Sequence, residues 1–139
     1  MTPIQMANMA AIVANKGSYI TPHFVKAVKN QGTENKQELW EKFSFPTNTT
    51  SIERKHCETV GEAMELVVKY GTARRAFIPD IAVCGKTGTV QNPHGENHAV
   101  FVGYAPAENP KIAVAVIIEN AGGGGTWAAP TASLMIEKY

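Results

Sequence analysis

The chain has 139 residues, of which 13 are basic and 12 acidic. The resulting formal net charge of +1 gives no reason to expect a nucleic-acid or membrane-surface partner. Hydrophobic residues make up 44% of the chain and charged residues 18%, which indicates a globular protein and excludes intrinsic disorder. Because no run of 18 apolar residues is present, no segment is expected to span a membrane.

A first helix is predicted within residues 2–17. Thr2 and Gln5 have the Thr-x-x-Gln spacing of a capping box, and Pro3 fits the first helical position. The residues between Pro3 and Ala14 are apolar nearly all round, whereas a surface helix would show a single apolar stripe. We therefore expect this helix to be surrounded by protein.

The next segment is less regular. A loose alternation of apolar residues predicts a short strand around residues 24–28. Residues 30–50 are mostly polar and contain turn-forming residues, so we expect a loop or an edge hairpin that carries Trp40 and Phe43.

A second helix is predicted within residues 50–71. Thr50 and Glu53 have the spacing of a capping box, and a glycine at position 71 suits the helix end. The two arginines that follow, at positions 74 and 75, are expected to be solvated. Four residues are spaced to form one amphipathic face, namely Cys57, Val60, Met64 and Val67.

The last third of the chain reads as three strands and a helix. The strands are predicted at residues 81–89, 98–105 and 111–119, and the short links between them predict antiparallel neighbours. In the third strand Ala113 and Ala115 share one face, which would let a helix pack closely. The final helix begins near Pro130, with one face formed by Ala132, Met135, Ile136 and Tyr139.

These elements predict an α+β fold. Its sheet would be antiparallel, with the three C-terminal strands and a further edge strand, and helices would pack against it.

Residues 84–91, CGKTGTVQ, place a lysine, two threonines and two glycines at the end of an apolar run. A phosphate-binding loop would need a glycine at position 80, where Asp80 stands, and a helix after Lys86, where the residues favour strand and turn. A substrate-binding strand edge fits better. The ammonium and hydroxyl groups can hold a carboxylate, and unpaired backbone N–H groups can stabilise an oxyanion. An ordinary hairpin strand with a solvated lysine remains open at this point.

The lysine–threonine–glycine triplet is one of three sequence elements of β-lactamases and penicillin-binding proteins. Five blocks of the chain, in the family's order, resemble the class B penicillin-binding proteins, and most closely the elongation-type penicillin-binding protein 2 group. They are residues 2–17, 68–76, 83–91, 98–120 and 128–139.

The resemblance implies a penicillin-binding-protein and β-lactamase-like transpeptidase fold. For the full-length parent it implies a peptidoglycan D,D-transpeptidase at the periplasmic face of the inner membrane. The implied substrate is the D-Ala-D-Ala end of a stem peptide, and β-lactams would acylate the same serine. No cofactor and no metal are implied.

Carried onto this sequence, the resemblance assigns roles to residues 86–89. Lys86 would supply positive charge and relay a proton, while Thr87 and Thr89 would bind the substrate carboxylate. The Thr89 backbone N–H would form one half of an oxyanion hole. Gly88, which has no side chain, would let the ligand backbone come close.

Two elements of the family are missing, because none of the four serines lies in a Ser-x-x-Lys or a Ser-x-Asn pattern. The resemblance places both elements upstream of the first helix. Residues 1–139 are therefore expected to be the C-terminal part of a transpeptidase domain, a soluble piece that is inactive alone, with Met1 an added start. Three alternatives remain: a fragment of a serine β-lactamase, a fragment of a D,D-carboxypeptidase, and a non-catalytic module that forms a homodimer through exposed apolar surface.

Other candidate sites have weaker support. His94 and His98 are four residues apart in a turn rather than on a helix, which argues against a metal site. Cys57 and Cys84 are expected to be buried thiols rather than a disulfide or metal ligands. The glycine run at residues 122–125 is expected to be a flexible connector rather than an anion site.

Overall fold

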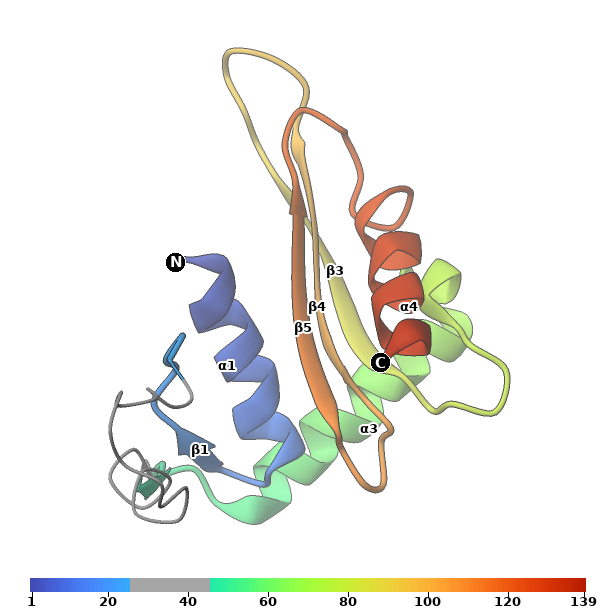
Figure 1. The fold of residues 1–139 in the computed structure, drawn as a ribbon. Helices are drawn as coiled ribbons and strands as arrows, with labels where there is room; N and C mark the ends of the chain where they lie inside the picture. Colours follow the sequence, from blue (N-terminus) through green and yellow to red (C-terminus); the bar gives the residue numbers. More distant parts are fainter. Residues whose placement is uncertain (26–45) are drawn as a thin grey trace, which may run out of the picture.

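The computed structural model describes residues 1–25 and 46–139. In chain order its elements are α1 (Pro3–Ala14), β1 (Ser18–Ile20), β2 (Thr47–Thr49), α3 (Arg54–Tyr70), the 3-10 helix η1 (Arg74–Ala76), β3 (Cys84–Val90), β4 (His98–Ala105), β5 (Ile112–Ile118) and α4 (Ala128–Lys138). The last three strands form an antiparallel sheet in the order β3-β4-β5. Helices α1 and α4 lie on opposite sides of this sheet (Figure 1), and α3 packs mainly against the edge strand β3. The predicted α+β class, the three strands and their antiparallel order are confirmed.

The face of the sheet toward α4 holds the main hydrophobic core. Phe101, at the centre of β4, is fully buried there. Its ring lies across two glycines that face each other on neighbouring strands, Gly85 and Gly103. A Cβ atom at either glycine would overlap the ring, so both positions require the missing side chain.

Helix α4 packs through alanines, which let it come close to the sheet. Ala132 and Ile136 are buried, as predicted. Met135 and Tyr139 were also expected on the buried face, but they are 47% and 79% exposed, so that part of the prediction is wrong. The buried face is instead completed by two residues of the first turn, Ala128 and Ala129.

Helix α1 begins with the predicted capping box. The Thr2 backbone N–H donates to Gln5 Oε1 at 2.8 Å, and the Gln5 backbone N–H donates to Thr2 Oγ1 at 3.4 Å. The helix packs on β5 near Ala113, which supports the predicted close approach of a helix to the small residues of that strand. Only Ala10 and Ala14 are buried, however, so the expectation that protein surrounds this helix is not met within the described residues.

Helix α3 differs from prediction at its start and on its buried face. Glu53 is the N-cap residue without a side-chain cap, and Thr50 Oγ1 accepts from the Ile52 backbone N–H instead, so the predicted capping box is wrong. The helix ends at residue 70, as predicted, and buries Cys57, Gly61 and Val68. Val60, predicted on the buried face, is 46% exposed.

The two short strands β1 and β2 pair with each other and not with the main sheet. The strand expected at residues 24–28 is wrong for residues 24 and 25, which belong to no strand, and its remainder lies outside the described residues. The loop or hairpin expected within residues 30–50 lies mostly outside the described residues, with Trp40 and Phe43, and its one described strand, β2, pairs with β1 rather than with a strand of that segment. Among the helices of the described ranges, none is long and apolar enough to cross a bilayer.

Candidate active site

The tetrad formed by residues 86–89 lies on the edge strand of the sheet. Strand β3 pairs only with β4, so its other edge carries no strand within the described residues. Lys86 and Thr89 are exposed, while Thr87 and Gly88 are half-buried. The tetrad is therefore accessible along an open strand edge, as the sequence predicts for a ligand-binding strand.

Alternate residues of the tetrad face opposite sides of the sheet. Lys86 is paired with Val102 and lies on the face of α1 and α3, whereas Thr87 is paired with Phe101 and lies on the face of α4. The Lys86 ammonium donates to the Thr87 carbonyl oxygen at 2.7 Å. The lysine thus holds its charge close to the backbone of the strand edge.

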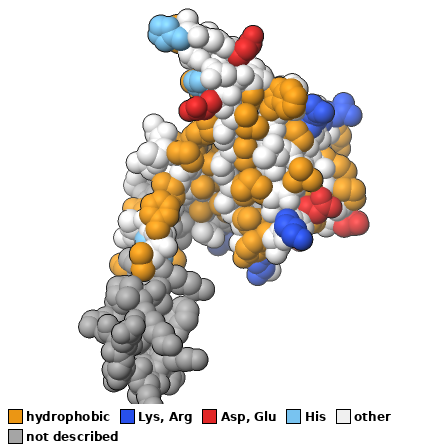
Figure 2. Space-filling view, turned by 45° about the horizontal axis from the view of Figure 1, so that its top comes forward, with side chains coloured by type: hydrophobic (Ala, Val, Ile, Leu, Met, Phe, Trp, Pro, Cys, Tyr) orange, Lys and Arg blue, Asp and Glu red, His pale blue; other side chains and the backbone are white. Residues whose placement is uncertain are grey.

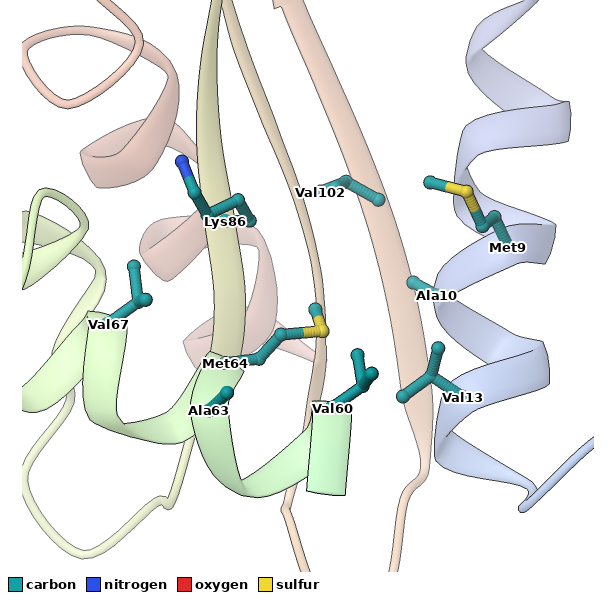
Figure 3. Close-up of a pocket in the computed structure, with 9 residues that line it drawn as sticks. All are labelled: Met9, Ala10, Val13, Val60, Ala63, Met64, Val67, Lys86 and Val102. Carbon is teal, nitrogen blue, oxygen red and sulfur yellow. The ribbon is translucent and has the colours of Figure 1, made fainter. Parts of the chain in front are cut away.

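A groove of about 480 Å³ opens beside Lys86, between α1, α3 and the sheet (Figure 3). Apart from the lysine, its lining is apolar and consists of Met9, Ala10, Val13, Val60, Ala63, Met64, Val67 and Val102. Small-molecule sites combine an apolar lining with several convergent polar groups, and this groove offers one. Its lining is therefore better suited to apolar side chains than to a polar substrate.

The sequence contains a signal for this groove. Val60 and Val67 fall on the predicted apolar face of α3, and α1 is apolar on nearly every side. In the structure these surplus apolar residues border the groove instead of a closed core. Hydrophobic side chains are also visible over much of the described surface in the space-filling view (Figure 2).

Thr87 has a hydrogen-bond partner, Thr72, that belongs to no motif of the sequence. The Thr72 and Thr87 hydroxyl oxygens are 2.8 Å apart and form a hydrogen bond. Thr72 follows directly on the glycine that ends α3, Gly71, so the end of this helix brings the hydroxyl to the strand. The only sequence signal was that Thr72 lies in one of the five blocks that resemble the family.

The glycine run packs against the tetrad and is not a free connector, contrary to the prediction. A Cβ atom at Gly124 would overlap backbone atoms of Gly88 and Val100. A Cβ atom at Gly125 would lie 2.6 Å from the Thr72 carbonyl oxygen. This loop therefore supports the same strand from the α4 side.

Arg75, which follows α3, forms a hydrogen bond with the loop before α4. Its Nη1 donates to the Thr126 carbonyl oxygen at 2.9 Å. The side chain is exposed, as expected, but it has a structural partner. Three segments that are distant in sequence thus meet at the tetrad: the end of α3, strand β3 and the loop before α4.

The two cysteines are free and buried, as predicted. Cys84 begins β3, and burial raises the pKa of its thiol, while the hydrogen bond with Tyr104 works in the opposite direction. Burial also raises the pKa of the Tyr104 hydroxyl. Both groups are therefore neutral near pH 7, and Cys84 is a poor nucleophile.

Of the two histidines considered as metal ligands, His98 has a structural hydrogen bond. His98 Nδ1 accepts from the Asn120 backbone N–H at 3.1 Å, which ties the start of β4 to the turn that follows β5. Within the described residues, no three His, Cys, Asp or Glu side chains are grouped so that they could hold a metal ion.

Comparisons with known proteins agree with this architecture. Residues 1–137 match the family described as the penicillin binding protein transpeptidase domain. The chain is 34% identical to the peptidoglycan D,D-transpeptidase MrdA of Haemophilus influenzae, over 99% of this chain and 23% of that protein. It is 35% identical to the stage V sporulation protein D of Bacillus subtilis, over 94% of this chain and 21% of that protein.

Solved structures give the same result. A ceftriaxone acyl-enzyme complex of penicillin-binding protein A from M. tuberculosis matches with a TM-score of 0.81 and 27% identity, over 99% of this chain and 32% of that one. Pseudomonas aeruginosa PBP2 in complex with WCK 5153 matches with a TM-score of 0.71 and 38% identity, over 97% of this chain and 29% of that one. The chain thus spans less than a third of each relative named here, and it belongs to the penicillin-binding protein transpeptidase domain family, among the class B proteins.

Proposed function

We propose that residues 1–139 form one wall of the active site of a serine-type peptidoglycan D,D-transpeptidase of the penicillin-binding protein 2 kind. The observation that carries the proposal is the open strand edge at residues 86–89, with Lys86 at the rim of an apolar groove. The named relatives support it, since one is a D,D-transpeptidase by name and another was solved as a β-lactam acyl-enzyme. By the same likeness, the site would face the periplasm.

The reaction proceeds in two steps through a covalent intermediate. The serine oxygen bonds to the carbonyl carbon of the penultimate D-Ala, and the bond to the terminal D-Ala breaks. The serine proton passes through a base to the departing amine. An amine of a second stem peptide then attacks the acyl-enzyme, and the serine regains its proton.

The tetrad contributes binding and charge to these steps. The Lys86 ammonium provides positive charge near the reacting centre and takes part in proton transfer. The hydroxyls of Thr87 and Thr89 donate to the terminal carboxylate of the substrate. The Thr89 backbone N–H stabilises the oxyanion, a contribution worth about 3 kcal/mol of barrier for one such donor.

The nucleophile is supplied by a segment outside this sequence. None of the four serines of the chain lies in the family's nucleophile pattern, and the groove beside Lys86 presents apolar side chains to an incoming segment. Residues 1–139 would therefore be the C-terminal part of the catalytic domain. The chain alone would form no acyl-enzyme and would hydrolyse no β-lactam.

A fluorescent penicillin tests this assignment. The full-length protein that contains this segment should give a covalently labelled band on a denaturing gel, and the 139-residue chain should give none. Lys86→Ala in the full-length protein should slow labelling by about a hundredfold, the range expected for loss of an acid–base group. A labelled band from the 139-residue chain would refute the assignment of the nucleophile. Rapid turnover of penicillin by the full-length protein would instead indicate a β-lactamase, and release of D-Ala without crosslinking would indicate a D,D-carboxypeptidase.

A second candidate function is a non-catalytic module that pairs with another copy of itself. The observation that favours it is the exposed apolar rim of the groove, where Met9 and Val60 are each nearly half exposed. Sedimentation equilibrium of the 139-residue chain distinguishes the two readings. Pairing through the groove should weaken when Val60 is replaced by Asp, whereas a monomer at all concentrations rejects this candidate.

A further inference from the structure

Thr72 belongs to the neighbourhood of the tetrad although it lies 15 residues earlier in the chain. We propose that Thr72 is a positioning residue for carboxylate recognition. Its hydroxyl donates to Thr87 Oγ1 and so leaves the Thr87 proton free for the carboxylate of the substrate. This inference rests on the proposed function, because it assigns a task within the same site.

The two hydroxyls of Thr72 and Thr87 together have two protons to donate. Each threonine hydroxyl has one proton to donate and can also accept, so either oxygen could be the donor across the 2.8 Å contact. An ionised carboxylate only accepts. When a carboxylate binds Thr87, that hydroxyl must donate to it, and Thr72 must then be the donor to Thr87.

This arrangement strengthens the hydrogen bond to the ligand. A hydroxyl whose oxygen accepts a hydrogen bond becomes polarised and is a better donor to the next acceptor. The hydroxyl of Thr72 also fixes the rotation of the Thr87 hydroxyl, which would otherwise sample other directions. Thr72 thus prepares Thr87 for an anionic acceptor without touching the reacting atoms.

The backbone holds Thr72 firmly in this position. The backbone N–H groups of Gly71 and Ala73, on either side, both donate to the Val67 carbonyl oxygen, at 3.0 and 3.2 Å. Ala73 is fully buried, and the close approach of Gly125 leaves no room behind the Thr72 carbonyl. The side chain itself is exposed, so it can be replaced without opening a core cavity.

A purely structural role is the main competing explanation. The hydrogen bond would then only fasten the end of α3 to β3, and its loss would disturb every ligand of the site equally. The proposed role predicts a selective effect on ligands that carry a negative carboxylate. The charge of the ligand therefore separates the two explanations.

The experiment compares penicillin G with its methyl ester, which keeps the lactam and lacks the negative charge. The second-order acylation rate constant of the full-length protein is measured for the wild type, Thr72→Val and Thr72→Ser. Thr59→Val is the matched control, because Thr59 is an exposed threonine on α3 whose hydroxyl donates to the Lys55 carbonyl oxygen of its own helix. With penicillin G, Thr72→Val should lower the rate about fivefold, the equivalent of one hydroxyl hydrogen bond.

The same variant should leave the reaction with the methyl ester within about twofold of the wild type, since a 1.4 kcal/mol change would already give tenfold. Thr72→Ser should restore the rate with penicillin G, and Thr59→Val should match the wild type with both ligands. Equal slowing with both ligands, or no slowing with penicillin G, overturns the role of Thr72 and leaves the proposed function intact. A wild type that is not acylated at all overturns the proposed function, and the inference with it.

Discussion

The two faces of the sheet differ in how completely they are packed. On the α4 face, Phe101 is fully buried against small residues of α4 and the glycines beneath its ring. On the opposite face, α1 and α3 leave a groove of about 480 Å³ beside Lys86. The difference suggests that the closed face fixes the strand that carries the tetrad, while the open face leaves room for further protein.

Neighbouring residues of β4 test this contrast directly, because Phe101 faces the closed side and Val102 lines the groove. In the 139-residue chain, Phe101→Ala should lower the free energy of unfolding by about 4 kcal/mol, since it leaves a large cavity in a packed core. Val102→Ala should cost about 1 kcal/mol, because its side chain is only partly buried. Urea unfolding followed by circular dichroism measures both values. Equal losses would mean that the groove is closed in solution.

The glycine loop offers a smaller and more local test. Gly124→Ala places a methyl group against backbone atoms of Gly88 and Val100, which cannot move aside by changing a rotamer. We expect a loss of about 2 kcal/mol in the free energy of unfolding, as for other overpacked positions, and a shift of the Gly88 amide resonance.

The matched control is Gly123→Ala in the same loop, where the added carbon would meet only Thr126 Oγ1 at 3.8 Å. This change should stay within about 0.5 kcal/mol of the wild type. If Gly124→Ala is as harmless as its neighbour, the loop does not brace the tetrad.

The smallest expected effect is a loss of stability at alkaline pH that arises from Cys84, at the start of β3, and Tyr104. The folded protein raises the pKa of Cys84 above its ordinary value of 9.0 and that of Tyr104 above 10.0. The folded state therefore holds these protons more tightly than the unfolded chain. Stability from this pair is complete below pH 9.0 and is lost as the pH rises above it.

The decline in stability can be followed by thermal unfolding at a series of pH values between about 7 and 11, which brackets the titration of both groups. Replacing Cys84 by Ala should delay its onset to about pH 10.0, where Tyr104 begins to titrate in the unfolded chain. An onset that does not move would show that the thiol contributes nothing to the pH dependence.

Much of the fold could be predicted from local patterns. The alternation in β3, β4 and β5 and the short links between them were sufficient for the sheet, and the capping box of α1 was visible in four residues. The buried faces of the helices were less accurate. Met135 is exposed and Ala129 is buried because of the way α4 packs on the sheet. The spacing of apolar residues along a helix does not predict that packing distance.

The candidate site was predictable only along one strand. Residues 86–89 stood out because charge, hydroxyls and glycine follow an apolar run. The contributions of Thr72 and Gly124 come from segments brought together by the tertiary fold, and no local rule connects positions so far apart in sequence. Their roles became apparent from the hydroxyl contact and from the missing space for a side chain.

The packing of α1 on β5 has a consequence for synthesis on the ribosome. Ala14 belongs to the same buried cluster as Ala113, so this helix meets its partner strand only after about a hundred further residues have been made. At ordinary translation speeds that interval is roughly 5 to 20 seconds. During that time the apolar residues of the nascent helix have no partner strand to pack on, and they gain one only when β5 has been made.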